Sequence, residues 1–334
     1  MKVPFIHGPH DLRLCEVEMP RAGPRDVVLR VAATGVCGSD LGALAMGGVS
    51  GPRPEPTPLG HELSGTVIEA GAEVSSVVVG DRVILNPLIN LIGNGGPEGG
   101  FAERLLVRDV AGSPQSLLKL PGSISFELGA LVEPLAVGAH AATRLGAKPG
   151  DKVAIFGGGP IGLATLIALR HRGVEDVVVL EPSAFRRERA LRLGARDVVD
   201  PLATPPAEAL IALHGSVAVF RSQAPQTTHY LEASGAPLLP EIVAMARLEA
   251  TICVASVQKK PVSLNFQSIL AKELTITGTL AYPSELGEVI GMLRDGAFDP
   301  EPMISHRFAA YEVMAAFETA QQADRSAKVL VRYE

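Results

Sequence analysis

The chain has 334 residues, with 30 Lys and Arg against 36 Asp and Glu, which gives a net charge of −6. This length suits two domains of ordinary size, and the sequence holds no basic run of the kind that favours nucleic acid or an anionic membrane as a partner. Three scattered cysteines, Cys15, Cys37 and Cys253, do not make a disulfide framework. Together with an N-terminus that lacks the apolar segment of a signal peptide, this favours a cytoplasmic protein.

The first third of the chain has the pattern of short β-strands separated by glycine and proline. Apolar runs predict strands at 26–32, 65–71 and 80–85, with glycine turns at their ends. Short strands with such frequent punctuation favour a compact, barrel-like β domain. From residue 127 to 145 the pattern becomes helical, and we expect Pro134 to break this helix.

Two short segments of this β region carry side chains that bind metals. The first delivers the thiol of Cys37, and the second, past a loop rich in proline and glycine, delivers the imidazole of His61 and the carboxylate of Glu62. A further carboxylate, Glu133, precedes the second half of the chain. Zinc takes these ligand types in tetrahedral sites, and a catalytic site needs three of them plus an open position. Either segment alone would more often be structural, because a lone cysteine on an apolar strand is usually a small buried hydrophobe.

A second unit begins near residue 149 and has the pattern of a dinucleotide-binding fold. A buried strand at 152–156 leads directly into a glycine-rich turn, a helix that ends near residue 172, and a second strand at 177–180 closed by Glu181. This order is the context that makes a glycine motif informative. The stretch 153–169 carries no charge, but its glycine interruption falls where a strand turns into a helix, so we interpret it as core and not as a membrane span.

Each glycine of the turn has a physical role. Gly157 permits the tight turn, Gly159 lets the backbone approach a pyrophosphate at the helix N-terminus, and Gly162 lets helix and strand pack closely. Glu181 lies 19 residues after Gly162, at the spacing of the acid that binds the adenosine ribose. The candidate cofactor-binding residues are Gly157, Gly159, Pro160, Ile161, Gly162, Glu181 and Arg186.

Glu181 also bears on the choice of cofactor. Its carboxylate can accept both ribose hydroxyls and would repel a 2′-phosphate, so the sequence favours NAD over NADP. Arg186 and Arg187 follow on the next predicted helix and could soften that repulsion. For Arg187 we expect a solvated helix face.

The rest of the chain continues the alternation of strands and helices. We expect a short strand at 197–200, a strand at 274–279, helices at 285–294 and 312–322, and a last strand at 328–332, whereas the pattern is weak from 216 to 255.

A series of motifs, taken in order, resembles a known family. Gly-Val-Cys37-Gly-Ser-Asp, Gly60-His-Glu with Gly65, Gly80-Asp-Arg-Val, Gly99-Gly-Phe-Ala-Glu and Glu133-Pro-Leu occur in the order found in the zinc-dependent medium-chain dehydrogenases. The resemblance is nearest to their sorbitol, butanediol and threonine dehydrogenase branch. It implies an α/β fold with a GroES-like, β-rich catalytic domain over 1–135 and 276–334, and a Rossmann NAD-binding domain with a doubly wound parallel sheet over 136–275.

The resemblance also implies roles for site residues. Cys37 and His61 would bind a catalytic zinc together with Glu62 or Glu133, and the sequence leaves open which carboxylate does so. Asp40 would support His61 through its second ring nitrogen, although an Asp in this position also commonly caps a turn. Ser39 would take the substrate proton. Arg186 has the position of the basic residue that contacts the adenosine ribose in NAD-using relatives.

This sequence departs from the family in three places. The histidine that usually completes the proton relay is replaced by Gly42. The segment 86–98 contains no cysteine, so we expect one catalytic zinc per chain and no structural zinc. Relatives usually carry glycines where Glu249 and Ala250 stand.

For the substrate pocket we expect Ser39 and Glu62, joined by Leu88, Phe101 and the segment near Tyr282.

These observations predict an oxidoreductase that uses zinc and NAD to transfer a hydride between a secondary alcohol, vicinal diol or polyol, or the matching ketone, and the nicotinamide. Two alternatives stay open: a metal-free reductase of activated double bonds, and a dinucleotide-binding protein without turnover. We expect a homodimer or homotetramer, as is known in this fold, with no nucleic acid or membrane partner.

Overall fold

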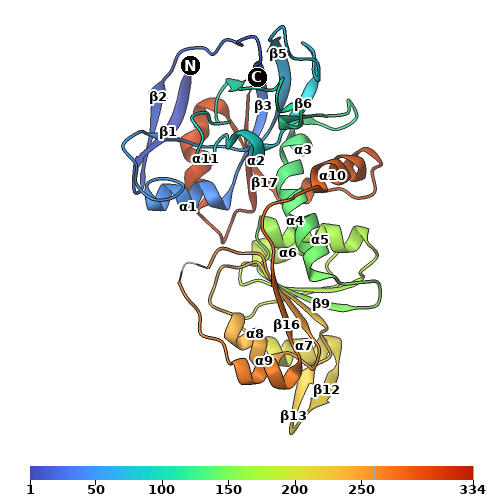
Figure 1. Cartoon of the computed structure of the whole chain (residues 1–334). Helices are drawn as coiled ribbons and strands as arrows, with labels where there is room; N and C mark the ends of the chain where they lie inside the picture. Colours follow the sequence, from blue (N-terminus) through green and yellow to red (C-terminus); the bar gives the residue numbers. More distant parts are fainter. Residues whose placement is uncertain (259, 334) are drawn as a thin grey trace.

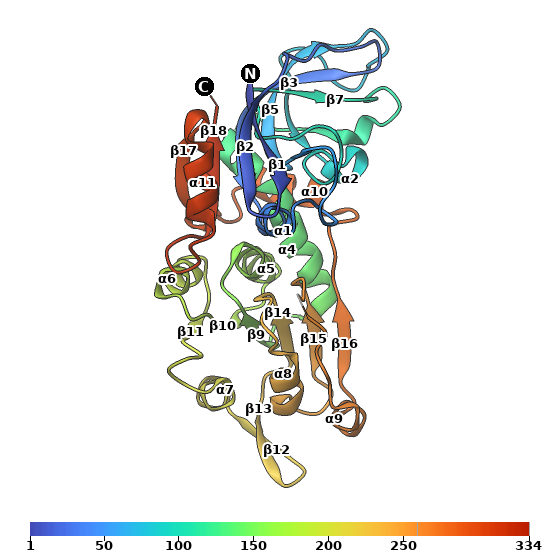
Figure 2. The ribbon, with the colours of Figure 1, turned by 90° about the vertical axis from the view of Figure 1, so that its left-hand side faces the viewer.

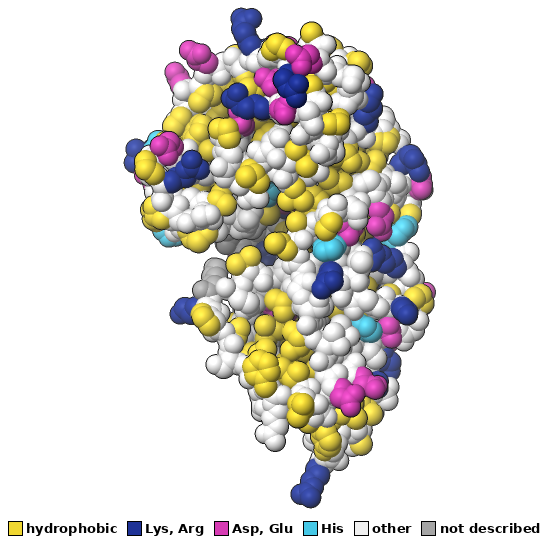
Figure 3. Space-filling model, viewed as in Figure 1, with side chains coloured by type: hydrophobic (Ala, Val, Ile, Leu, Met, Phe, Trp, Pro, Cys, Tyr) yellow, Lys and Arg dark blue, Asp and Glu magenta, His cyan; other side chains and the backbone are white. Residues whose placement is uncertain are grey.

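The computed structural model describes residues 1–258 and 260–333, and they form two domains (Figure 1). One domain contains both termini, whereas the other is formed by the middle of the chain. In the described part of the chain, no helix is long and apolar enough to cross a membrane. On the face drawn in Figure 3, basic side chains are scattered among acidic ones and do not gather in one patch.

The domain that holds the termini is built on a mostly antiparallel sheet in the order β17-β18-β3-β5-β6-β8, with β7 also pairing with β3. A smaller sheet has the order β2-β1-β4. The strands are β1 (Lys2–Gly8), β2 (Asp11–Glu16), β3 (Val27–Val36), β4 (Thr57–Pro58), β5 (Glu62–Ala70), β6 (Arg82–Leu85), β7 (Arg104–Val107), β8 (Leu117–Lys119), β17 (Ile304–Ala309) and β18 (Lys328–Arg332). Its helices are α1 (Gly38–Met46), α2 (Pro87–Asn90), α3 (Phe126–Ala130), α10 (Glu285–Arg294) and α11 (Val313–Ala320).

Strand β3 organises this domain, because β-branched residues such as Val27 and Val28 favour an extended backbone that is buried on both faces. It pairs with β5 on one side, and β18 pairs with it from the other, with Val329 opposite Val36. The end of the chain therefore lies beside the segment that carries Cys37.

The second domain is a six-stranded parallel sheet in the order β11-β10-β9-β14-β15-β16. The order reverses between β9 and β14, which is the switch point where doubly wound sheets bind dinucleotides. Its strands are β9 (Lys152–Phe156), β10 (Asp176–Leu180), β11 (Asp197–Val199), β14 (His229–Glu232), β15 (Thr251–Val254) and β16 (Thr275–Gly278). Its helices are α4 (Val132–Leu145), α5 (Pro160–His171), α6 (Ala184–Arg192), α7 (Pro206–His214), α8 (Leu239–Met245) and α9 (Phe266–Lys272), and a hairpin, β12 (Ser216–Val219) with β13 (Ser222–Pro225), precedes β14.

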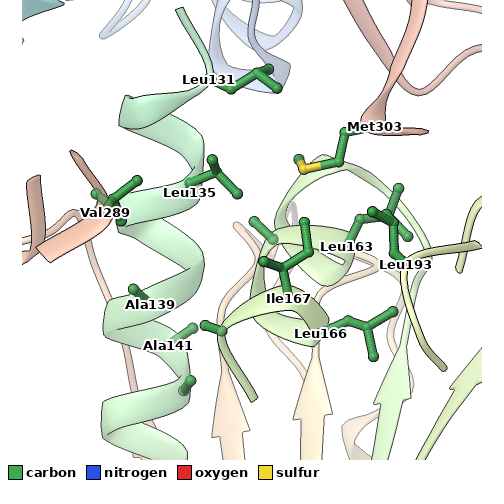
Figure 4. Packing of buried hydrophobic residues seen from close by; sticks show 14 of the residues in the cluster. Leu131, Leu135, Ala139, Ala141, Leu163, Leu166, Ile167, Leu193, Val289 and Met303 are labelled. Carbon is green, nitrogen blue, oxygen red and sulfur yellow. The ribbon is translucent and has the colours of Figure 1, made fainter. Parts of the chain in front are cut away.

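One apolar cluster runs through both domains. Figure 4 shows Leu135 on α4 pointing toward Leu163 and Ile167 on α5, with Met303 from the other domain beside them. Gly138 lets α4 approach closely, because a side chain there would run into Ala164. The helix that follows Glu133 is therefore packed directly on the first helix of the dinucleotide fold.

The helical segment expected at 127–145 is broken, but not at Pro134. Helix α3 ends before Leu131 and α4 begins after it. Pro134 lies in the first turn of α4, where its missing N–H has no intrahelical partner to lose. The prediction of a break was correct, and its position was wrong by a few residues.

Two features refine the expectations for the second domain. The strand Thr275–Gly278 belongs to the parallel sheet, so the expected boundary between residues 275 and 276 falls inside a strand, and we place the end of the domain after Gly278. Glu249 has φ of 60°, in the left-handed region that glycine adopts at little cost. Its N–H donates to the Lys272 carbonyl at 2.8 Å, which holds this conformation.

Candidate metal and cofactor site

The thiol of Cys37 lies where β3 passes into α1, and Cys37 is the N-cap residue of that helix. Asp40, in the first turn, accepts hydrogen bonds from the N–H of Cys37 at 2.9 Å and from the N–H of Gly60 at 3.3 Å. This carboxylate is fully buried, and burial raises the pKa of Asp40. Asp40 thus caps the turn and also ties the cysteine segment to the histidine segment.

One ring nitrogen of His61 faces Asp40. The other faces the metal cluster, by which we mean the group of Cys37, His61 and Glu62. Its Nδ1 lies 3.6 Å from Oδ1 of Asp40, which is longer than a hydrogen bond, and has no other partner in the described chain. Its Nε2 lies 3.4 Å from the Ser39 hydroxyl. Burial alone would lower the pKa of His61, but the negative charges of Asp40 and Cys37 raise it well above its ordinary value. The site therefore attracts positive charge.

The carboxylate of Glu62 is paired with a lysine that the sequence alone did not indicate. Lys328, the first residue of β18, lies 2.6 Å from both carboxylate oxygens and donates to the carbonyl of Val36 at 3.1 Å. Glu62 is 0% and Lys328 1% exposed. Gly35 stands opposite Glu62 in the β3–β5 pair, and a Cβ at that position would collide with the Glu62 side chain. The only signal in the sequence is one charge at the head of an apolar strand.

Glu133 approaches the same cluster from the first turn of α4. Burial, and then the charge of Glu62, raise the pKa of Glu133 to about 7, against the opposing charges of His61 and Lys328. A carboxyl with this pKa takes up or releases a proton near neutral pH.

Tyr282 also faces the cluster, as expected for the segment around it. Its side chain is 2% exposed, and its hydroxyl has no hydrogen-bond partner among the described residues. Burial and the neighbouring charges of Glu133 and Glu62 raise its pKa, so the hydroxyl stays protonated. The residue before it, Ala281, has φ of 56°, and this turn of the backbone separates Tyr282 from Leu280, which is 85% exposed.

Cys37, His61 and Glu62 together form a group suited to a metal ion. One ligand atom from each lies within 4.8 Å of the other two. Glu133 is not part of this group, although its charge acts on His61. A thiol, an imidazole and a carboxylate that converge in a buried, negatively charged place fit zinc, and Asp40 behind the imidazole is the usual outer partner.

The glycine turn of the second domain has the geometry that a dinucleotide site needs. Gly157 has φ of 104°, and a side chain at Gly162 would run into the Gly157 carbonyl. Gly159 is the N-cap of α5, and Pro160 and Ile161 beside it are only partly buried. The N-terminus of α5 is therefore open toward the place of a pyrophosphate.

Glu181 directly follows β10, beside this turn. Its Oε2 accepts a hydrogen bond from the N–H of Gly158 at 2.7 Å, and its Oε1 accepts one from the N–H of Ser183 at 2.8 Å. Each carboxylate oxygen has a further lone pair for a ribose hydroxyl. Glu181 is 5% exposed, and these two hydrogen bonds fix the orientation of its carboxylate before any ligand binds.

Two adjacent arginines of α6, Arg186 and Arg187, differ in their partners. The guanidinium of Arg186 lies beside Gly159, within 3.8 Å of where a Cβ would stand, and burial lowers its pKa. Arg187 does not lie on a solvated helix face, so that expectation was wrong. It donates to the carbonyls of Glu181 and Pro182 at 2.7 Å each and pairs with Asp200 at 3.1 Å. These contacts keep its charge away from the ribose position.

The expected pocket residues lie in different surroundings. Phe101 is 1% exposed and packs edge-on against Phe317, with ring centroids 5.1 Å apart. Its backbone contacts the segment before His61, because its N–H donates to the Leu59 carbonyl at 3.3 Å. Leu88, on α2, is 40% exposed and remains a candidate for the pocket.

A β-rich domain with a buried thiol, imidazole and carboxylate group, joined to a doubly wound sheet with a dinucleotide turn, defines a zinc-binding, dinucleotide-dependent dehydrogenase. Comparisons with known proteins agree with this class. Residues 23–122 match the alcohol dehydrogenase GroES-like domain, and residues 160–295 match the zinc-binding dehydrogenase domain.

Whole-chain relatives identify the family. The chain is 31% identical to (R,R)-butanediol dehydrogenase of Bacillus subtilis (strain 168) over 99% of both chains. It is also 31% identical to sorbitol dehydrogenase of Bos taurus, over 95% of this chain and 92% of that one. The crystal structure of 2R,3R-butanediol dehydrogenase from Bacillus subtilis matches with a TM-score of 0.85 at 28% identity, over 99% of both chains. The chain belongs to the zinc-dependent medium-chain dehydrogenase family and is an oxidoreductase, which confirms the resemblance and the expected fold class.

Proposed function

We propose that this protein uses one zinc ion per chain and NAD to transfer a hydride between a secondary alcohol, vicinal diol or polyol, or the matching ketone, and the nicotinamide. The observation that carries the proposal is the buried group of Cys37, His61 and Glu62, whose ligand atoms lie within 4.8 Å of one another. The diol and polyol substrates named for the butanediol and sorbitol dehydrogenase relatives support this substrate class.

Each residue of the site has a proposed task. When bound, zinc would act as a Lewis acid on the substrate oxygen, and NAD would accept the hydride. Cys37, His61 and Glu62 hold the ion, because their ligand atoms already converge. Asp40 holds the imidazole so that Nε2 faces the cluster, and Ser39, 3.4 Å from that nitrogen, takes the substrate proton.

The proton then needs a route that does not use the usual histidine, because position 42 is glycine. Glu133 is the best placed group, since its carboxyl is close enough to act on His61 through its charge and its pKa is about 7. We propose that Glu133 acts there as a proton acceptor or donor and is not the third zinc ligand. The protonated hydroxyl of Tyr282 lies beside Glu133 and can donate to a substrate oxygen.

NAD is the proposed cofactor, held by Gly157, Gly159, Pro160, Ile161 and Gly162 at the pyrophosphate and by Glu181 and Arg186 at the ribose. The fixed carboxylate of Glu181 would repel a 2′-phosphate. Arg187 cannot offset this repulsion without leaving Asp200 and two backbone carbonyls. The geometry therefore favours NAD over NADP.

A homodimer is the proposed assembly, formed through β16. This strand is an edge of the six-stranded sheet, and its backbone can pair with the same edge of a second copy about a two-fold axis. Large apolar side chains near it are exposed: Leu280 by 85% and Leu270 by 79%. Substitution Ile276→Lys on the strand should give monomers in sedimentation analysis. A tetramer would require a second contact in addition to this one.

We place the enzyme in the cytoplasm, where a zinc-binding thiol stays reduced.

Elemental analysis of freshly purified protein, combined with a panel of 2,3-butanediol, sorbitol and 2-butanol with NAD, tests the proposal. We expect close to one zinc per chain, loss of that zinc in Cys37→Ala, and NAD reduction by at least one alcohol. Cys253→Ala is the matched control, because Cys253 is buried away from the cluster in the second domain and should leave the zinc content unchanged. Folded protein that binds no zinc, even when it is supplied, would contradict the mechanism and direct attention to a metal-free reductase.

A further inference from the structure

The first turn of α6 is fastened to a loop of the other domain. This connecting loop, residues 321–327, joins α11 to β18, and Figure 2 shows it reaching down to α6. Arg186 donates through Nε to the carbonyl of Ser326 at 2.8 Å, and the Ser183 hydroxyl donates to the carbonyl of Asp324 at 3.1 Å. The arginine expected at the adenosine ribose is thus already bound across the domain interface.

The other end of the connecting loop is the lysine of the metal cluster. Two residues after Ser326 the chain reaches Lys328, whose Nζ lies 2.6 Å from both oxygens of Glu62 and 3.1 Å from the carbonyl of Val36, the residue before Cys37. Ser305 braces this stretch, because its hydroxyl accepts from the N–H of Ala327 at 2.9 Å and donates to the carbonyl of Lys328 at 3.1 Å. Ser305 thus links the Arg186 end of the connecting loop to its Lys328 end.

We propose that Arg186 is a positioning residue that couples the adenosine end of the cofactor site to the metal cluster through the connecting loop. A ligand that engages Arg186 and Glu181 also acts on the Ser326 carbonyl, and a change at Ser326 is passed to Lys328 and from there to Glu62 and Cys37. NADH and zinc therefore bind with positive cooperativity. This inference rests on the proposed function, since it requires that the chain bind both ligands.

The sign of the coupling follows from ordering. Each ligand restricts the same short segment, NADH from the Arg186 end and zinc from the Lys328 end. The second ligand then finds the segment already ordered and loses less conformational freedom on binding. Coupling between sites typically changes affinity by about 5- to 150-fold, and for a link of this length we expect a value near the lower limit. By reciprocity NADH must tighten zinc binding by the same factor.

The test is the affinity for NADH, measured by fluorescence titration on zinc-loaded and on chelator-stripped protein. The wild-type chain should bind NADH at least about fivefold more tightly with zinc than without it. In Arg186→Lys, which keeps the charge but loses the Nε donor, the ratio should fall to near one. Arg187→Lys is the matched control, since Arg187 is the adjacent arginine and its partners among the described residues, Glu181, Pro182 and Asp200, belong to its own domain, so its ratio should stay at the wild-type value.

Amide hydrogen exchange gives a second measurement that needs no variant. NADH should slow exchange in the connecting loop of the wild-type protein, where the N–H of Ser326 donates to the Gln322 carbonyl at 2.9 Å. Equal NADH affinities with and without zinc, a ratio retained in Arg186→Lys, or unchanged exchange in the loop on NADH binding would overturn the coupling. Absence of zinc binding or of NADH binding would instead overturn the proposed function.

Discussion

Among single substitutions at the metal cluster, we expect Lys328→Met to lower the free energy of unfolding the most. The substitution keeps most of the side-chain volume and removes the charge that lies 2.6 Å from both oxygens of Glu62. It leaves a carboxylate with 0% exposure and no cationic partner in direct contact. It also leaves the carbonyl of Val36 without this donor.

The size of the loss can be bounded in two ways. Removing one partner of a buried ion pair costs about 3–5 kcal/mol. The carboxylate can escape by taking a proton, and for a glutamic acid that titrates near 4.3 when unfolded, protonation at pH 7 costs roughly 3.5 kcal/mol. We therefore expect Lys328→Met to lower the free energy of unfolding by about 3–4 kcal/mol at pH 7.

Guanidinium unfolding of zinc-free protein at pH 7 measures this difference. The double variant Glu62→Gln with Lys328→Met has no buried charge at this pair and should recover at least half of the loss. A deficit below about 1 kcal/mol, or a double variant as unstable as the single one, would refute the reasoning.

Three further changes have expected outcomes away from this pair. Glu249→Gly should raise the free energy of unfolding by roughly 0.5–1 kcal/mol, because the left-handed conformation at φ 60° costs an L residue more than glycine loses in entropy, whereas Glu249→Ala should bring no gain in thermal melts. Burial lowers the pKa of His214 to about 4, and since the unfolded imidazole titrates near 6.5, the unfolded state binds more protons between these values. Stability should therefore fall by up to about 3 kcal/mol from pH 7 to pH 4, and urea midpoints of His214→Gln should lack this part of the pH dependence. Glu181→Gln should shift the ratio of NADPH to NADH affinity roughly tenfold toward NADPH in fluorescence titrations, and an unchanged ratio would exclude Glu181 as the discriminating group.

The elements that could be predicted closely are those with a strong local signal. The strand at 152–156, the helix at 285–294 and the strand at 328–332 have the expected bounds, and the two helices on either side of Leu131 lie where one broken helix was expected. In each case the apolar run ends within a few residues at a glycine, at a proline, or where the spacing of the apolar residues changes. Local sterics decide such boundaries, so the sequence contains the information.

Contacts between distant segments could not be predicted in the same way. Lys328 and Glu62 are 266 residues apart, and the pairing of both β18 and β5 with β3 brings them together. Arg187 has the spacing of an exposed helical residue, but Asp200 and two carbonyls on neighbouring segments bind it. Phe101 and Phe317 are more than 200 residues apart, and their rings pack edge-on in the same apolar cluster. Which partner a side chain finds depends on packing that no local pattern specifies.

The segment 86–98 shows how the histidine of the site can be supported without the cysteine lobe of the relatives. Ile92 is 0% exposed and anchors the segment in the core of the first domain, and the N–H of Gly93 donates to the Glu98 carbonyl at 2.8 Å. Further along the chain, Gly100 lies against the backbone that precedes His61, and its N–H donates to the Gly60 carbonyl at 2.8 Å. Neither Gly93 nor Gly100 has room for a side chain against that backbone. Close contact between two backbones therefore fixes the loop that presents His61, and the position of the imidazole depends on glycines that lie more than 30 residues further along the chain.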